Sequence, residues 1–187
     1  MKILILGIGN ILFGDEGVGP HLANLIQEKY TFDSHEHTVE VIDGGTLAQR
    51  LIPIITEYDH VVIIDCVKVD DGAIGDVYSF FFSDMPEYIT WDGSAHEVEM
   101  LQTLQMIDMM GDLPPTKIVG VIPYVIGEDS TFQMTDEVIK ASHVMERAIM
   151  DYVRTLGVEP RITNNTVTIE ELAPTTYMKG ITYDLGV

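Results

Sequence analysis

The chain has 187 residues, of which 46% are hydrophobic and 21% charged, a composition typical of one globular domain rather than a disordered protein. Its 30 acidic against 10 basic residues give a formal net charge of -20, which excludes nucleic acid and anionic membranes as natural partners, although the acidity could also serve solubility alone. The single cysteine, Cys66, allows no intrachain disulfide, and no stretch of about 18 apolar residues predicts a membrane span, so a cytoplasmic protein is expected.

The chain opens with an apolar strand followed by a glycine-rich turn. Residues 2–6 form a continuous apolar run, as a strand buried on both faces requires. Pro20 is tolerated only in the first turn of a helix, so a helix is expected to begin near Gly17. A strand, a glycine-rich turn and a helix are how a nucleotide-binding fold begins.

The next elements are predicted to be three further strands. Residues 39–43 form a strand pattern that ends in the turn Asp43-Gly44-Gly45-Thr46, and a helix follows whose length Pro53 puts in doubt. Residues 60–66 contain the most strand-like run of the chain, and residues 75–82 are expected to form another strand.

The second half of the chain predicts two helices around one strand. Ser94 and Glu97 have capping-box spacing, and the helix behind them should end at Gly111. A strand is expected over 117–122 and a long amphipathic helix over 135–152.

Two segments are therefore distinguished: a single α/β domain over 1–156 and a C-terminal extension over 157–187. The extension shows no clear pattern, and it is interpreted as a mobile tail or as an edge strand around 166–169.

Alternating strands and helices predict an α/β fold, a three-layer sandwich in which a twisted, mainly parallel five-stranded sheet has helices on both faces. Ligands of such sheets gather at the carboxyl ends of the strands. Asp15 and Glu16, Asp43, Asp65 and the segment with His96 would all lie at that edge.

A dinucleotide site is one interpretation of the opening turn. Gly7 and Gly9 match the first two glycines of the Rossmann fingerprint, and Asp43 could hold a ribose, but Leu12 takes the third glycine position. Asp15 and Glu16 would repel a pyrophosphate at the positive end of the first helix. This interpretation is the weaker one.

A metal-contacting site is the other interpretation. Glu16, Asp65 and His96 are distant in sequence but can converge at one sheet edge, and two carboxylates with an imidazole suit nickel or zinc with open coordination positions. His96 in the first turn of its helix would be kept neutral by the helix dipole, which leaves a nitrogen lone pair for a metal.

Each residue also has a plain structural explanation. Glu16 could simply favour a helix N-terminus, Asp65 could bond loop amides, and His96 could be a surface histidine. Cys66 fits a small buried residue better than a nucleophile, because no basic activator adjoins it. Only the combination of the three residues favours a metal.

The sequence carries five motifs in a defined order: Gly7-Ile8-Gly9-Asn10-Ile11-Leu12, Asp15-Glu16-Gly17-Val18-Gly19, Asp43-Gly44-Gly45-Thr46, Ile63-Ile64-Asp65 and Ser94-Ala95-His96. With these motifs, residues 1 to about 155 resemble the hydrogenase maturation endopeptidases. The resemblance implies an α/β sandwich that removes a C-terminal extension from the large subunit of nickel–iron hydrogenase after nickel has been inserted. The expected partner is thus the nickel-loaded large-subunit precursor, and a monomer suffices.

The resemblance also implies roles for individual residues. Glu16, Asp65 and His96 match the residues that contact nickel, which would be supplied by the substrate, although another divalent ion could substitute in the free protein. They are also the expected catalytic residues, because the metal could activate water or a carboxylate could act as general base. Asp43 matches a position linked to substrate recognition, and Gly44-Gly45 would let the substrate approach the backbone. A non-proteolytic nickel-binding maturation factor is the alternative.

Overall fold

The computed structural model describes residues 1–34, 36–46, 48–90, 95–124 and 130–175, without the side chains of 95–97. A five-stranded sheet forms its centre. The sheet has the order β3-β1-β4-β8-β6, in which only the β6–β8 pair is antiparallel. The predicted mainly parallel five-stranded sheet is confirmed. Its strands are β1 (Lys2–Ile8), β3 (Thr38–Gly45), β4 (His60–Cys66), β6 (Val77–Phe81) and β8 (Thr116–Val121).

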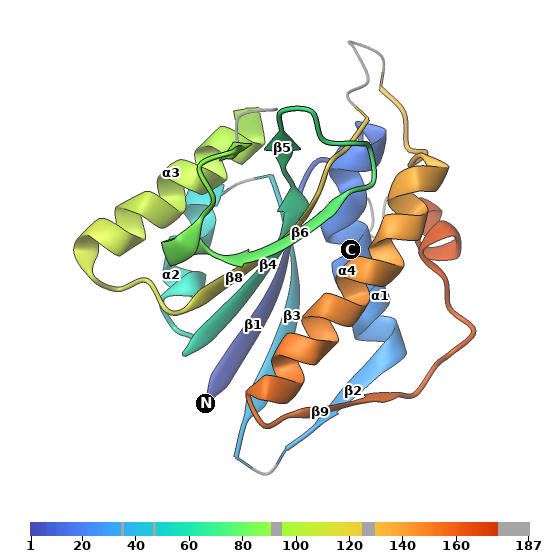
Figure 1. The fold of residues 1–187 in the computed structure, drawn as a ribbon. Helices are drawn as coiled ribbons and strands as arrows, with labels where there is room; N and C mark the ends of the chain where they lie inside the picture. The colour runs from blue at the N-terminus through green and yellow to red at the C-terminus, as the bar shows by residue number, and fades with distance from the viewer. Residues whose placement is uncertain (35, 47, 91–94, 125–129, 176–187) are drawn as a thin grey trace, which may run out of the picture.

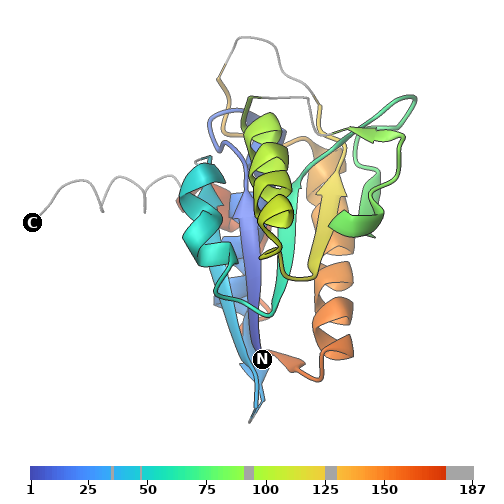
Figure 2. The same ribbon diagram turned by 90° about the vertical axis from the view of Figure 1, so that its left-hand side faces the viewer.

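Helices cover both faces of this sheet, as the sequence predicts (Figure 1). The helices α1 (Val18–Lys29) and α4 (Asp136–Thr155) pack on one face. The other face carries α3 (Ala95–Met110), the short α2 (Ile52–Ile55) and the 3-10 turn η2 (Ala48–Leu51). Figure 2 looks onto this second face, with α2 and α3 in front of the sheet.

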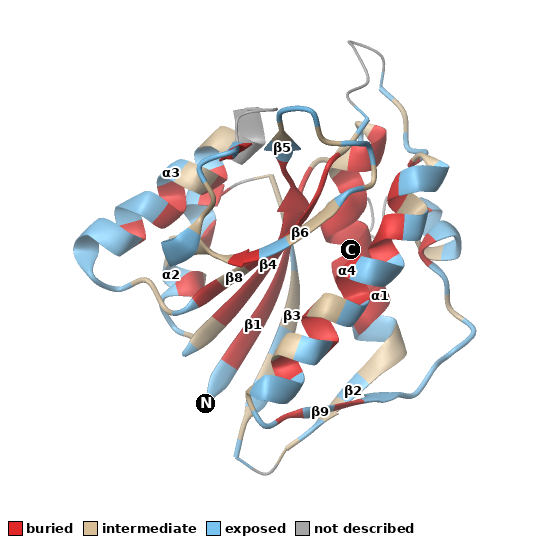
Figure 3. Ribbon diagram, viewed as in Figure 1, coloured by how far each residue is buried: buried red, intermediate tan, exposed pale blue. Residues whose placement is uncertain are grey.

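Alternate residues of each central strand supply two separate cores. In β1, Ile3 and Ile5 pack toward α1 and α4, whereas Leu4 and Leu6 pack toward α3. All four are fully buried, which explains why the strand needs an unbroken apolar run. The buried residues of β1 and β4 form the continuous red band in Figure 3.

The long helix α4 begins close to its predicted start. The Thr135 hydroxyl caps it by accepting a hydrogen bond from the Val138 amide, and Asp136 and Glu137 in its first turn complement the helix dipole. The helix predicted around Pro53 is short, because the chain passes through η2 before a four-residue α2.

Several short strands escaped prediction. The strands β2 (Tyr30–Asp33) and β9 (Glu159–Ile162) form an antiparallel pair, and β5 (Lys68–Val69) pairs with β7 (Ile89–Thr90). The strand considered around 166–169 is wrong, because residues 169–175 are helical. Ile169 and Ala173 on this helix join the core beneath α1 and α4. No helix among the described residues is both long and apolar enough to cross a membrane.

Gly19 is expected to be irreplaceable. A Cβ at this position would lie 2.0 Å from the carbonyl oxygen of Ile8 and 2.5 Å from that of Ile64. Gly19→Ala should therefore lower the free energy of unfolding by more than about 3 kcal/mol, measured by urea denaturation. Gly111→Ala is the control: Gly111 has φ +80° and open space around it, so only the backbone cost of about 1 kcal/mol is expected. Equal losses in the two variants would contradict the steric explanation.

Candidate functional site

The predicted site residues belong to segments that meet at the carboxyl edge of the sheet. Gly7 of β1 lies opposite both Asp43 of β3 and Ile64 of β4, so the three strands end at the same level. The 3-10 turn η1 (Gly14–Gly17), which follows β1 and carries Glu16, contacts the end of β4. The structure therefore brings the segments of Glu16, Asp43 and Asp65 together.

The two neighbouring carboxylates of the opening turn have different environments. Asp15 is fully buried and accepts hydrogen bonds from the backbone amides of Thr135 at 2.7 Å and Tyr124 at 2.8 Å. The Thr135 hydroxyl donates a third bond at 2.9 Å. Glu16, in contrast, is only partly buried. Asp15 is thus a structural residue, and Glu16 is the carboxylate of the pair that stays accessible at the edge.

The glycines of the opening turn pack against the chain itself. A Cβ at Gly9 would lie 1.9 Å from the carbonyl oxygen of Glu16, and Gly19 is enclosed by β1 and β4. The glycines therefore let the turn close tightly, with the segment of Glu16 beside β4.

Asp65 is buried at the end of β4, with 1% of its surface exposed. Its Oδ1 accepts a hydrogen bond from the Cys66 amide at 2.7 Å. The Cys66 thiol, buried as predicted, donates to the carbonyl oxygen of Asp15 at 3.4 Å. This contact ties the end of β4 to the turn that carries Glu16.

His96 lies in the first turn of α3, which begins on the side of the sheet where β1 and β4 end (Figures 1 and 2). Its side chain and the proposed Ser94 cap lie outside the described part of the structure. Among the side chains that are described, no three His, Cys, Asp or Glu residues come close enough to hold a metal ion. The set of Glu16, Asp65 and His96 therefore stays a prediction.

Asp43 is exposed at the end of β3, and both of its oxygens are already held by this chain. Oδ1 accepts from the Gly45 amide at 3.1 Å, and Oδ2 accepts from the Asn24 side-chain amide of α1 at 3.1 Å. Gly45 has φ +57° and open space around it, whereas a Cβ at Gly44 would lie 2.8 Å from Ile8 Cδ1. Gly45 thus has open space beside it and Gly44 packs against side chains of β1, and contact of either glycine with a substrate stays a prediction.

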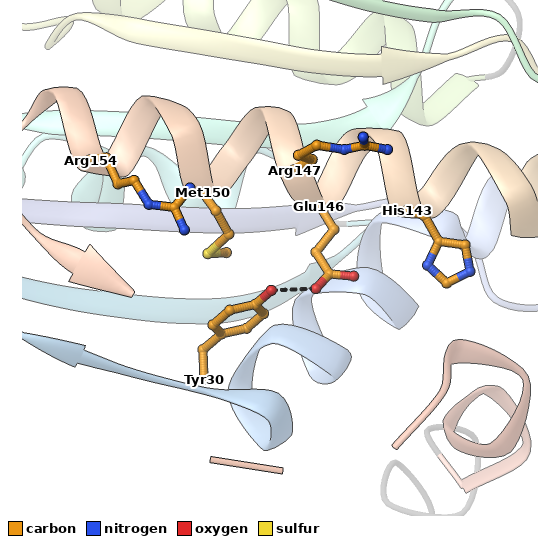
Figure 4. A pocket seen from close by; sticks show the side chains of 6 residues that line it. All are labelled: Tyr30, His143, Glu146, Arg147, Met150 and Arg154. Atoms are coloured by element: carbon orange, nitrogen blue, oxygen red, sulfur yellow. Dashed lines mark hydrogen bonds between the residues drawn. The ribbon is translucent and has the colours of Figure 1, made fainter. Parts of the chain in front are cut away.

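An open pocket of about 230 Å³ lies away from this edge, between α4 and the start of β2 (Figure 4). Its wall includes the buried Glu146, whose Oε1 accepts from the Tyr30 hydroxyl at 2.5 Å and pairs with Lys29 Nζ at 2.7 Å. Burial and the bond to Glu146 raise the pKa of Tyr30 well above its ordinary value. These contacts fasten β2 to α4, and no sequence prediction concerned this pocket.

His21 of α1 is a buried histidine that the sequence did not single out. Only 1% of its surface is exposed, and neither ring nitrogen has a hydrogen-bond partner among the described residues. Burial lowers the pKa of His21 from 6.5 to about 4, so the ring is neutral at pH 7. Its Nε2 lies 3.0 Å from where a Cβ of Gly17 would be, directly behind the turn that carries Glu16.

Comparison with known proteins identifies the family of this fold. The sequence model described as hydrogenase maturation protease matches residues 20–152. This chain belongs to the hydrogenase maturation protease family. Protein HydD of Wolinella succinogenes is 54% identical over 158 residues, which cover 84% of this chain and 98% of HydD.

Two further relatives link the family to its fold. The hydrogenase 2 maturation protease of Escherichia coli is 31% identical over 66% of this chain and 74% of its own length. The solved structure of the hydrogenase maturating endopeptidase HybD of E. coli superposes with a TM-score of 0.76 at 27% identity, over 87% of this chain and 98% of HybD. The protein is accordingly a protease of hydrogenase maturation with the HybD-type α/β fold.

Removing the charge of Asp15 is expected to destabilise the fold. In Asp15→Asn, the side-chain NH2 would face one of the two backbone amides, that of Tyr124 or that of Thr135, and leave this donor without an acceptor, so the free energy of unfolding should fall by about 3 kcal/mol. Asp108→Asn on the exposed surface of α3 is the control and should change it by less than about 0.5 kcal/mol. Urea denaturation measures both, and equal stability of the two variants would refute the structural role of Asp15.

The buried His21 predicts a loss of stability in mild acid. Between pH 6.5 and pH 4 the unfolded chain binds a proton at this residue while the folded chain does not, so stability falls as the pH falls. The shift corresponds to about 3 kcal/mol once the pH is below 4. His21→Leu should flatten the fall between pH 7 and pH 4.5, whereas His143→Leu on the exposed face of α4 should leave it unchanged. Parallel curves for His21→Leu and the unmodified protein would contradict the shift.

Proposed function

We propose that this protein is an endopeptidase that removes the C-terminal extension of a nickel–iron hydrogenase large-subunit precursor after nickel insertion. The nickel arrives with the precursor and is the feature that the enzyme recognises. The observation that supports this proposal best is the contact between η1 and the end of β4, which brings the segments of Glu16 and Asp65 together in a chain of this protease family. The enzyme acts in the cytoplasm as a monomer.

The donor set suits the proposed recognition. Glu16 and Asp65 supply carboxylate oxygens and His96 an imidazole, and such mixed oxygen and nitrogen ligands bind nickel and other divalent ions of similar character. A nickel ion with open positions in the precursor would be contacted only after its insertion. Recognition through the metal therefore restricts cleavage to precursor that already contains nickel.

The half-buried Glu16 is the residue best placed to accept a proton and to donate it again during hydrolysis. As general base, its carboxylate takes a proton from water while the water oxygen attacks the scissile carbonyl carbon. The carbon–nitrogen bond then breaks, and the proton passes from Glu16 to the leaving amine. Nickel would supply Lewis-acid polarisation of the carbonyl. Asp65, with Oδ1 held by the Cys66 amide, fits an orienting or ligating role better than a mobile base.

Asp43 and Gly45 offer the binding surface for the substrate chain. Each oxygen of Asp43 accepts one hydrogen bond within this chain and keeps a lone pair for a donor of the precursor. The open side of Gly45 gives a peptide access to the backbone. Gly44 supports this surface from the side of β1.

Incubation with purified precursor tests the proposal directly. The unmodified enzyme should shorten the nickel-loaded large subunit, as mass spectrometry would show, and leave the nickel-free precursor intact. Glu16→Gln, Asp65→Asn and His96→Gln should each reduce the rate by at least about 100-fold, because each removes a ligand or the base. Asp112→Asn on the surface is the control.

The outcomes separate the two candidate functions. A non-proteolytic nickel-binding maturation factor would bind the loaded precursor and leave its mass unchanged. Cleavage of loaded and nickel-free precursor at equal rates would retain the protease and reject metal recognition.

A further inference from the structure

The Asn24 side chain links α1 to the turn that begins at Asp43, at the end of β3. It is 8% exposed, and its amide nitrogen donates to the carbonyl oxygen of Pro20 at 2.8 Å and to Asp43 Oδ2 at 3.1 Å. An amide nitrogen has two hydrogens, so this donor is fully used. The first bond fixes the Asn24 side chain on its own helix, and the second fixes the carboxylate of Asp43.

The same turn is linked to the segment that carries Glu16. Gly45 donates its amide to Asp43 Oδ1 and accepts from the Gly9 amide at 3.0 Å through its carbonyl oxygen. Gly9 in turn packs on the carbonyl group of Glu16. A continuous chain of contacts therefore runs from Asn24 through Asp43 and Gly45 to η1, the turn that carries Glu16.

We infer that Asn24 is a positioning residue for substrate recognition, which acts by holding the Asp43 carboxylate in one orientation. The inference rests on the proposed function, in which Asp43 binds the precursor. An exposed carboxylate without this bond would rotate among several orientations, and the precursor would lose binding energy in ordering it. Loss of the Asn24 bond should therefore weaken binding of the precursor rather than slow the chemical step, because Asn24 contacts none of the reacting groups.

The test compares Asn24 with a matched residue of the same helix. Gln27 also donates from its side chain to β3, but to the backbone oxygen of Val41 rather than to Asp43. Asn24→Ala should raise the KM for nickel-loaded precursor by about tenfold with kcat changed less than about twofold, whereas Gln27→Ala should leave both unchanged. Asn24→Asp should raise KM further, because it sets two carboxylates against each other.

An exchange variant checks the contact without relying on cleavage. Asn24→Asp combined with Asp43→Asn re-forms an amide–carboxylate pair, so its melting temperature should recover from that of Asn24→Asp alone toward the unmodified value. Its KM should remain high, because the charge has moved to α1.

Two results would overturn the inference. One is an equal KM in Asn24→Ala and Gln27→Ala with an active unmodified enzyme, and the other is no thermal recovery in the exchange variant. Failure of the unmodified enzyme to cut the precursor would instead reject the proposed function.

Discussion

The hydrogen bonds to the buried Asp15 carboxylate are the interaction on which the carboxyl edge of the sheet, and with it the candidate site, depends. It accepts hydrogen bonds from two segments more than 100 residues further along the chain, one after β8 and one at the cap of α4. Burying a carboxylate is costly unless its oxygens are well bonded, so the turn after β1 has one favourable position. Glu16, the next residue, is fixed at the edge as a consequence.

The candidate site is therefore an extension of the core packing. Gly9 and Gly19 let the turn lie against β1 and β4, Asp15 closes it from the other side, and the bond from Gly9 to Gly45 joins it to β3. Catalytic groups held by packed elements keep their geometry without induced ordering. This packing fits the proposed recognition of a metal carried by the substrate, because the segments of Glu16 and Asp65 are already held together in the structure.

Much of the central sheet could be predicted, because buried parallel strands leave unbroken apolar runs in the sequence. The observed limits of β4, His60–Cys66, agree with the strand predicted over 60–66. β2 alternates apolar and polar residues over only four positions directly after α1, and β9 has four residues and contains Pro160, so neither pattern is distinct enough to mark a strand. Adjacent acidic residues look alike in sequence, and only the partners at Tyr124 and Thr135 distinguish Asp15 from Glu16. Asn24 escaped prediction because its partner, Asp43, lies 19 residues away on another element.

The buried thiol of Cys66 gives the site a natural probe of its own motion. It is the sole cysteine of the chain, and it lies beneath the carbonyl oxygen of Asp15, where the turn meets β4. With 1% of its surface exposed, Cys66 meets a thiol reagent only after the surrounding structure opens locally or the whole domain unfolds. The rate of alkylation of the unmodified protein therefore measures how often the structure around the Asp15–Cys66 contact opens.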